Sequence, residues 1–192
     1  IKGDIYNKDG YYENTEIVNI QESLLIDIGR WWPTTYGCNP MPPGWENSSH
    51  IKDHRIKLKS LIENMVSKRE GVSAIKDPRA SLLIPLWRNI CEELNIDLKI
   101  VASIRDPIEV VGSLMNRDRI TTGMTEERAS KLWYRHNYEL IHEFNRNKSM
   151  LIDYSQWFNM EKCLKQMAAL YQFCFDKEIT KEIEQKAMSK IV

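Results

Sequence analysis

The chain has 192 residues, of which 42% are apolar and 28% charged, and its 27 basic side chains balance 27 acidic ones. This composition favours a globular protein, and the length fits one domain, so we expect residues 1–192 to form a single domain. The balanced charge predicts no nucleic-acid partner, and no apolar run approaches the ~20 residues of a membrane helix. The four cysteines are scattered without a CxxC pair, which favours free thiols in a reducing compartment, and we expect a cytoplasmic protein.

The first part of the chain reads as two helices separated by a long loop. Apolar residues at helical spacing predict a helix that Asn14 caps and Gly29 ends. Residues 30–49 contain four prolines, two glycines and three tryptophans, which predicts a loop of functional length. A second helix is expected over about 50–69, and the short apolar run "VSAI" at 72–75 is expected to form a strand.

The second part alternates helices with strands. Helices are expected at about 80–94, 107–117, 126–145, 159–174 and 178–190, with strands at 98–104 and 150–154 and a polar loop at 117–125. Apolar strands alternating with helices indicate a parallel sheet covered on both faces. We therefore expect an α/β fold, a three-layer sandwich with a central parallel sheet, in which ligands bind at the carboxyl ends of the strands.

Cations follow two of the expected strands. "KDPR" follows the run at 72–75, and "RDP" follows the strand at 98–104. The prolines and aspartates of both motifs are explained by helix capping. Capping does not explain Lys76, Arg79 and Arg105, which should converge on one edge of the sheet beside positive helix N-termini. The pattern predicts an anion site there, and plain salt bridges are the alternative.

The helix after Arg105 carries features that suit an anion. Its expected buried face consists of Ile108, Val111, Leu114 and Met115. Gly112 and Ser113 lie on another strip, where a small residue stands beside a hydroxyl. An arginine fork and a serine hydroxyl together suit a phosphate or a sulfate.

Five segments resemble one family. "GYYENTEIVNIQESLL", "KDPRASLLIPLW", "IVASIRDPIEVVGSLMNRD", "LWYRHNYELI" and "LIDYSQW" are similar to the bacterial branch of the sulfotransferases that use 3′-phosphoadenylyl sulfate (PAPS). The resemblance covers about residues 10–160 and implies a sheet like that of the P-loop NTPases. It also implies that Arg105 and Ser113 bind the 3′-phosphate of the donor. The family's phosphate loop is absent from these residues, and we expect it to precede Ile1.

The resemblance also suggests catalytic roles. Glu13 corresponds to the family's glutamate base, and Lys76 to a lysine that contacts the transferred group. For Glu13 the alternative is a carboxylate that complements the dipole of the first helix. We expect no metal: His50 and His54 are spaced i, i+4, but no third ligand accompanies them.

The expected substrate-binding residues are Arg79, Trp32 and Trp45, and loop packing is the alternative for the tryptophans. The predicted function is transfer of a sulfuryl group from PAPS to a hydroxyl or amine acceptor, a carbohydrate or a small molecule. A P-loop kinase is the rival enzyme class, although the sequence contains no G-x-x-x-x-G-K-[ST] loop. A non-catalytic nucleotide- or glycan-binding remnant is the third interpretation.

Overall fold

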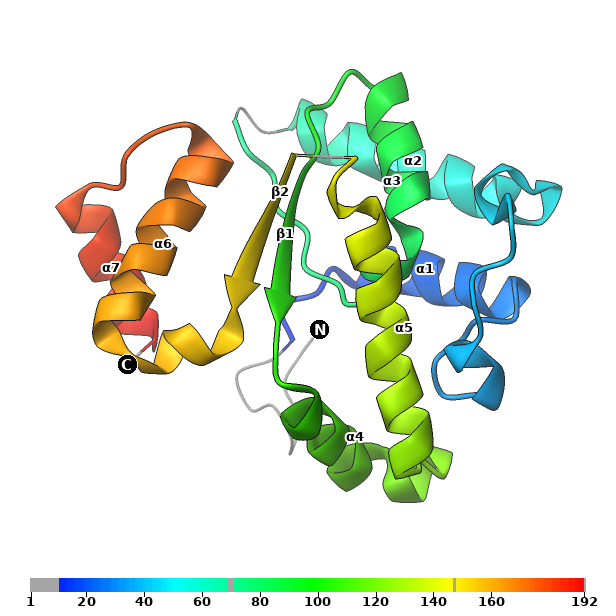
Figure 1. The fold of residues 1–192 in the computed structure, drawn as a ribbon. Helices are drawn as coiled ribbons and strands as arrows, with labels where there is room; N and C mark the ends of the chain where they lie inside the picture. The colour runs from blue at the N-terminus through cyan, green and yellow to red at the C-terminus, as the bar shows by residue number, and fades with distance from the viewer. Residues whose placement is uncertain (1–10, 69–70, 147, 192) are drawn as a thin grey trace.

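The structure is a computed structural model that describes residues 11–68, 71–146 and 148–191 (Figure 1). Its helices are α1 (Thr15–Asp27), α2 (Lys52–Ser67), α3 (Ala80–Glu93), α4 (Pro107–Thr122), α5 (Glu126–Phe144), α6 (Met160–Phe175) and α7 (Lys181–Ile191). The strands are β1 (Lys99–Ile104) and β2 (Lys148–Asp153). Short 3-10 helices are η1 (Thr35–Cys38), η2 (Trp45–Asn47), η3 (Ser49–Ile51) and η4 (Tyr154–Phe158).

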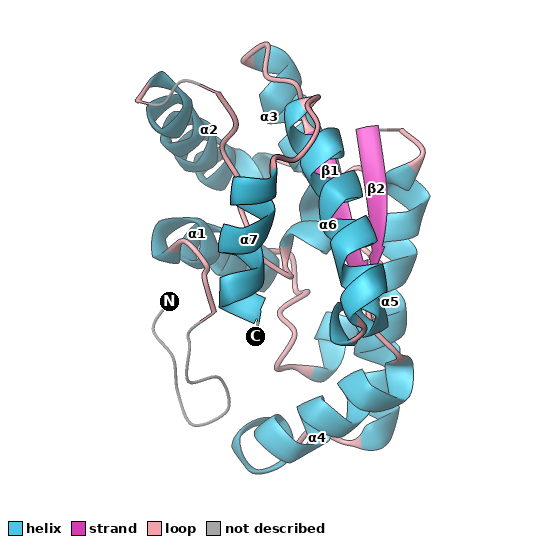
Figure 2. Cartoon of the chain, turned by 90° about the vertical axis from the view of Figure 1, so that its left-hand side faces the viewer, coloured by secondary structure: helices cyan, strands magenta, loops and turns pink. Residues whose placement is uncertain are grey.

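The two strands form a parallel sheet. They pair in register from Lys99 opposite Lys148 to Ile104 opposite Asp153. Both therefore end at the same edge, where β1 leads into α4 and β2 into η4 (Figure 1). Helices α6 and α7 lie on one side of the sheet, and α3 and α5 lie on the other (Figures 1 and 2). The α/β class is confirmed, but the two strands found among the described residues do not establish a three-layer sandwich.

The strand expected at 72–75 is wrong. Residues 72–77 have no regular secondary structure, and Val72 and Ile75 are exposed. A strand needs a neighbour for its backbone hydrogen bonds, and in the described part of the chain this segment pairs with neither β1 nor β2. Apolar character alone therefore predicted an element that has no partner.

Helix α4 also differs from expectation. It was predicted to end at 117, but it continues to Thr122 and stops at Gly123, whose φ of +61° provides the left-handed cap. The loop was therefore predicted to begin too early, at 117, within the helix. Ile108 was expected on the buried face and is 81% exposed. Only the middle of the helix, at Val111, Leu114 and Met115, packs on the core, so its first turn projects into solvent.

The apolar core consists of two clusters. The larger one joins α1, α2 and α3 and includes Trp45 from the loop before α2. The smaller one joins the start of α5 to Trp32 and to the middle of α4. Val101 and Leu151 of the sheet are exposed, so the strands contribute little to either cluster. The larger cluster fixes α1, α2 and α3 against one another, and Lys76 and Arg79 lie in the segment between α2 and α3.

The loop before α2 is held by a close backbone contact. A Cβ atom added at Gly37 would lie 2.5 Å from the carbonyl oxygen of Trp31 and 2.6 Å from Cα of Trp32. Only glycine fits there without a backbone shift. All four cysteines are free, as the sequence predicted. Within the described residues, no helix has the length and apolarity needed to cross a membrane.

Candidate functional site

A buried polar chain joins α1 to the segment before α3. Gln21 of α1 is completely buried, and its Nε2 donates to Oδ2 of Asp77 at 2.6 Å. Its Oε1 accepts a hydrogen bond from Nε1 of Trp87 in α3 at 2.9 Å. Both ends of the amide are therefore satisfied inside the core, which makes the arrangement stable and specific. These hydrogen bonds from Gln21 fix the position of Asp77, and Asp77 in turn fixes the position of Arg79.

Arg79 uses its guanidinium group to hold carboxylates together. Its Nη1 lies 2.8 Å from Oδ1 of Asp77, and its Nη2 and Nε bond Oε1 of Glu22 at 2.7 and 3.1 Å. Burial alone would lower the pKa of Arg79, but the hydrogen bonds and attraction from Asp77 and Glu22 raise it above its ordinary value. With these donors engaged, Arg79 links α1 to the segment before α3, and its expected role in substrate binding stays a prediction.

The two expected catalytic residues, Glu13 and Lys76, lie together. Nζ of Lys76 is 2.7 Å from Oε1 of Glu13, and Nη1 of Arg79 is 3.6 Å from Oε2 of the same carboxylate. The Glu13 side chain is 7% exposed and that of Lys76 is 56% exposed. The lysine head therefore remains accessible from solvent while the carboxylate beside it is enclosed. Such a pair presents a cation and a proton acceptor side by side.

Arg105 lies where the sequence placed it, directly after β1. Asp106 caps α4 by accepting a hydrogen bond from the backbone N–H of Ile108 at 2.7 Å. The backbone oxygen of Arg105 accepts one from Nε1 of Trp133 in α5 at 3.2 Å. These two contacts fix the backbone on either side of the arginine side chain.

The guanidinium group of Arg105 has two side-chain neighbours. Its Cζ lies 4.8 Å from the ring centre of Tyr154, a cation–π contact across the ends of the two strands. Its Nε bonds Oε2 of Glu109 at 2.6 Å. The parallel register brings the two strand ends together and so places Tyr154 beside Arg105. The Glu109 contact follows from i, i+4 spacing and was detectable.

Ser113 lies on the exposed surface of α4, two turns into the helix. Its hydroxyl makes no hydrogen bond to any residue that the structure describes. A Cβ at the neighbouring Gly112 would meet nothing within 4 Å, so the space over this turn is open. Arg105 makes no hydrogen bond or ion pair with Glu13 or Lys76 among the described residues. The structure therefore brings Glu13 and Lys76 into contact, whereas no contact joins Arg105 and Ser113 to each other or to that pair among the described residues.

The two expected substrate-binding tryptophans differ in placement. Trp45 is 6% exposed and packs in the larger core cluster, so loop packing explains it and an acceptor contact does not. Trp32 is half-buried, packs on the smaller cluster and has the guanidinium carbon of Arg117 5.7 Å from its ring centre. Trp32 is therefore partly exposed, and its expected contact with an acceptor stays a prediction.

The histidines do not form a metal site. His54 pairs with Asp27 at 2.6 Å, and in the described part of the chain no cluster of three or more metal-ligating side chains occurs. His136 of α5 contacts Oγ of Ser81 in α3 through Nδ1 at 2.8 Å. Burial of the ring lowers the pKa of His136 to about 4, so it is neutral at physiological pH.

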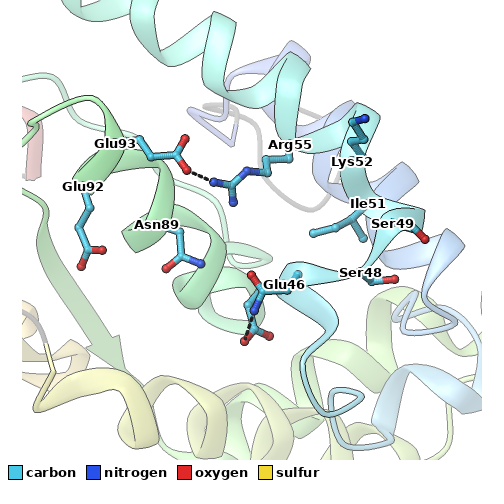
Figure 3. A pocket seen from close by; sticks show the side chains of 10 residues that line it. Glu46, Ser48, Ser49, Ile51, Lys52, Arg55, Asn89, Glu92 and Glu93 are labelled. Atoms are coloured by element: carbon cyan, nitrogen blue, oxygen red, sulfur yellow. Dashed lines mark hydrogen bonds and ion pairs between the residues drawn. The ribbon is translucent and has the colours of Figure 1, made fainter.

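A polar pocket of about 450 Å³ lies between the loop before α2 and the last turn of α3 (Figure 3). Arg55 reaches across it to Glu93, and Asn89 lines its α3 wall. None of the residues that line the pocket belongs to β1 or β2, and none of them is one of the predicted site residues. No pattern in the sequence predicted this pocket.

Comparisons with protein-family models, with curated proteins and with solved structures each found no significant match. The functional argument therefore rests on the residues and their geometry.

Proposed function

We propose that the chain is part of a sulfotransferase that moves a sulfuryl group from PAPS to a hydroxyl or amine acceptor, a carbohydrate or a small molecule. The observation that supports the proposal best is the arrangement at the end of β1. There Arg105 stacks on Tyr154, and the helix that follows carries an exposed serine, Ser113, over an open surface. A guanidinium fork and a hydroxyl suit a phosphate monoester.

The proposal assigns the anchoring of the donor to Arg105 and Ser113, which bind its 3′-phosphate. The donor's phosphosulfate end then lies away from this anchor. The proposal includes the three-layer sandwich with a central parallel sheet that the sequence predicts. Free thiols are consistent with a cytoplasmic location.

Glu13 and Lys76 supply the chemistry in this proposal. The acceptor oxygen attacks sulfur, a new sulfur–oxygen bond forms, and the bond from sulfur to the donor's 5′-phosphate oxygen breaks. Glu13 accepts the acceptor's proton, and adenosine 3′,5′-bisphosphate leaves. Lys76, with Nζ 2.7 Å from Glu13, offsets negative charge that develops on the bridging oxygen. Arg79 acts on the acceptor only indirectly, by holding Glu13 at 3.6 Å.

A transfer assay tests the proposal against its rivals. The protein is incubated with sulfur-labelled PAPS and a panel of sugar and phenol acceptors, with and without a metal chelator. We expect labelled product that the chelator does not reduce. Transfer from ATP that requires Mg²⁺ would favour a kinase instead. Binding of adenosine 3′,5′-bisphosphate without turnover would favour the non-catalytic remnant, and the absence of both binding and turnover would overturn the proposal.

A further inference from the structure

We propose that Glu109 is a built-in competitor of the phosphate group, which occupies Arg105 when no nucleotide is bound and moves aside when one binds. This inference rests on the proposed function. It begins from the 2.6 Å contact between Nε of Arg105 and Oε2 of Glu109. Glu109 makes no other hydrogen bond or ion pair among the described residues, so Arg105 is its sole anchor there.

The position of Glu109 on α4 explains why its carboxylate competes with a bound phosphate. Glu109 and Ser113 are four residues apart, so they lie on the same strip of the helix, one turn from each other. Arg105 contacts this strip from its N-terminal end, through Glu109 itself. Glu109 comes between Arg105 and Ser113 along this strip, and its carboxylate already accepts a hydrogen bond from Nε of Arg105 at 2.6 Å. A phosphate bound by Arg105 and Ser113 therefore competes with the carboxylate for the guanidinium group.

The displacement of Glu109 costs little. Its side chain is 56% exposed and that of Arg105 is 40% exposed, and exposed i, i+4 ion pairs contribute little stability. Tyr154 holds the guanidinium group at 4.8 Å independently of Glu109. Arg105 thus stays in place when the carboxylate swings into solvent. A dianionic phosphate monoester attracts the guanidinium group more strongly than a single carboxylate does, whereas a monoanionic ester has less advantage. Glu109 therefore also makes the site selective for dianions.

Isothermal titration calorimetry on wild type and Glu109→Gln tests this inference. Glutamine keeps the size of the side chain but removes its charge. We expect Glu109→Gln to bind adenosine 3′,5′-bisphosphate about three- to tenfold more tightly, because a competing negative charge is gone. Affinity for adenosine 5′-phosphate should stay unchanged. Glu127→Gln is the matched control, since Glu127 forms the same kind of exposed i, i+4 pair with Lys131 at 2.6 Å, and it should change neither affinity.

Inorganic phosphate as a second probe separates this inference from the proposed function. If no variant binds the bisphosphate but Glu109→Gln still binds inorganic phosphate more tightly than wild type, the competitor role stands and the sulfotransferase proposal fails. If Arg105→Ala loses affinity for the bisphosphate while Glu109→Gln equals wild type or binds more weakly, the proposed function stands and the competitor role is wrong. Equal phosphate and bisphosphate affinities in wild type and Glu109→Gln also contradict the competitor role.

Discussion

At the scale of single residues, the ion pairs around Glu13 determine how it can work. The Glu13 carboxylate lies beside two cations, because Nζ of Lys76 is 2.7 Å and Nη1 of Arg79 is 3.6 Å from its oxygens. Arg79, which the sequence marked as a substrate ligand, is a link between carboxylates. The Glu13 carboxylate therefore has two cationic neighbours, the exposed Lys76 and the half-buried Arg79.

Replacing Glu13 tests its role as the base. Glu13→Gln keeps the shape of the side chain but cannot accept the acceptor's proton, so kcat should fall by about 10²- to 10⁴-fold with donor affinity nearly unchanged. Steady-state kinetics with PAPS and an acceptor measure both quantities. Glu16→Gln is the control, because Glu16 is exposed in the first turn of α1, the helix that follows Glu13. Near-normal turnover in Glu13→Gln would show that Glu13 is not the base and only complements the dipole of α1.

A second residue-scale prediction concerns the buried amide of Gln21. Gln21→Glu would place a second carboxylate 2.6 Å from Oδ2 of Asp77, where no water screens the two charges. We expect the free energy of unfolding to fall by about 3 kcal/mol at neutral pH, as for an uncompensated buried charge. Urea denaturation measures the loss. Gln172→Glu, at an exposed position of α6, should change stability by less than about 0.5 kcal/mol. Equal effects of the two variants would mean that the buried hydrogen bonds of Gln21 contribute nothing to the free energy of unfolding.

At the scale of elements, the packing of α5 on α3 includes a histidine that remains neutral. The pKa of His136 is about 4 in the folded chain, below the ordinary value of 6.5. Between these two pH values the unfolded chain binds more protons than the folded one, so stability should fall as pH decreases from 6.5 to 4. The full shift corresponds to about 3 kcal/mol. We expect somewhat less, because the residue keeps some contact with solvent.

The measurement is urea denaturation of wild type and His136→Gln at several pH values between 4 and 7. The difference in unfolding free energy between the two proteins should shrink as pH falls across this window. His50→Gln serves as the control, because His50 is exposed. A constant difference between wild type and His136→Gln over the whole window would show that His136 titrates normally in the folded protein.

The loop before α2 allows a matched pair of glycine substitutions. In Gly37→Ala the new methyl group would lie 2.5 Å from the backbone oxygen of Trp31, so the loop must shift, and we expect a loss of at least about 2 kcal/mol. Gly112→Ala adds the same methyl group in open space within α4, and it should stabilise the protein by up to about 1 kcal/mol. Thermal unfolding ranks the two, and a Tm of Gly37→Ala at or above that of wild type would contradict the loop geometry.

At the scale of the whole molecule, sequence patterns predicted the features that depend on residues close together in the chain. The caps at Asn14 and Asp106 were predicted as such, and the helices that follow them begin within a residue of each cap. The strand at 72–75 was wrong because a strand depends on a partner that sequence periodicity does not reveal. The early end predicted for α4 shows the same limit, since its polar second half looks like a loop when its neighbours are unknown.

The candidate site was predicted in part for a similar physical reason. The positions of Arg105 and Ser113 follow from strand-end and helix-surface patterns within one segment. The Tyr154 contact and the buried chain from Gln21 to Trp87 join segments far apart in sequence. A glutamine on a helix reads as a surface residue, and only the packing of α1 on α3 places it in the core. Long-range polar contacts of this kind have no signature in one sequence.

The central claim is that Arg105 reads the 3′-phosphate of a nucleotide donor. Calorimetry on wild type and Arg105→Ala, with adenosine 3′,5′-bisphosphate and with adenosine 5′-phosphate, tests it most directly. Losing a charge-assisted hydrogen-bond donor should weaken bisphosphate binding by roughly 1.5–3 kcal/mol and leave the binding of adenosine 5′-phosphate nearly unchanged. Equal losses for the two nucleotides, or none for either, would contradict the account.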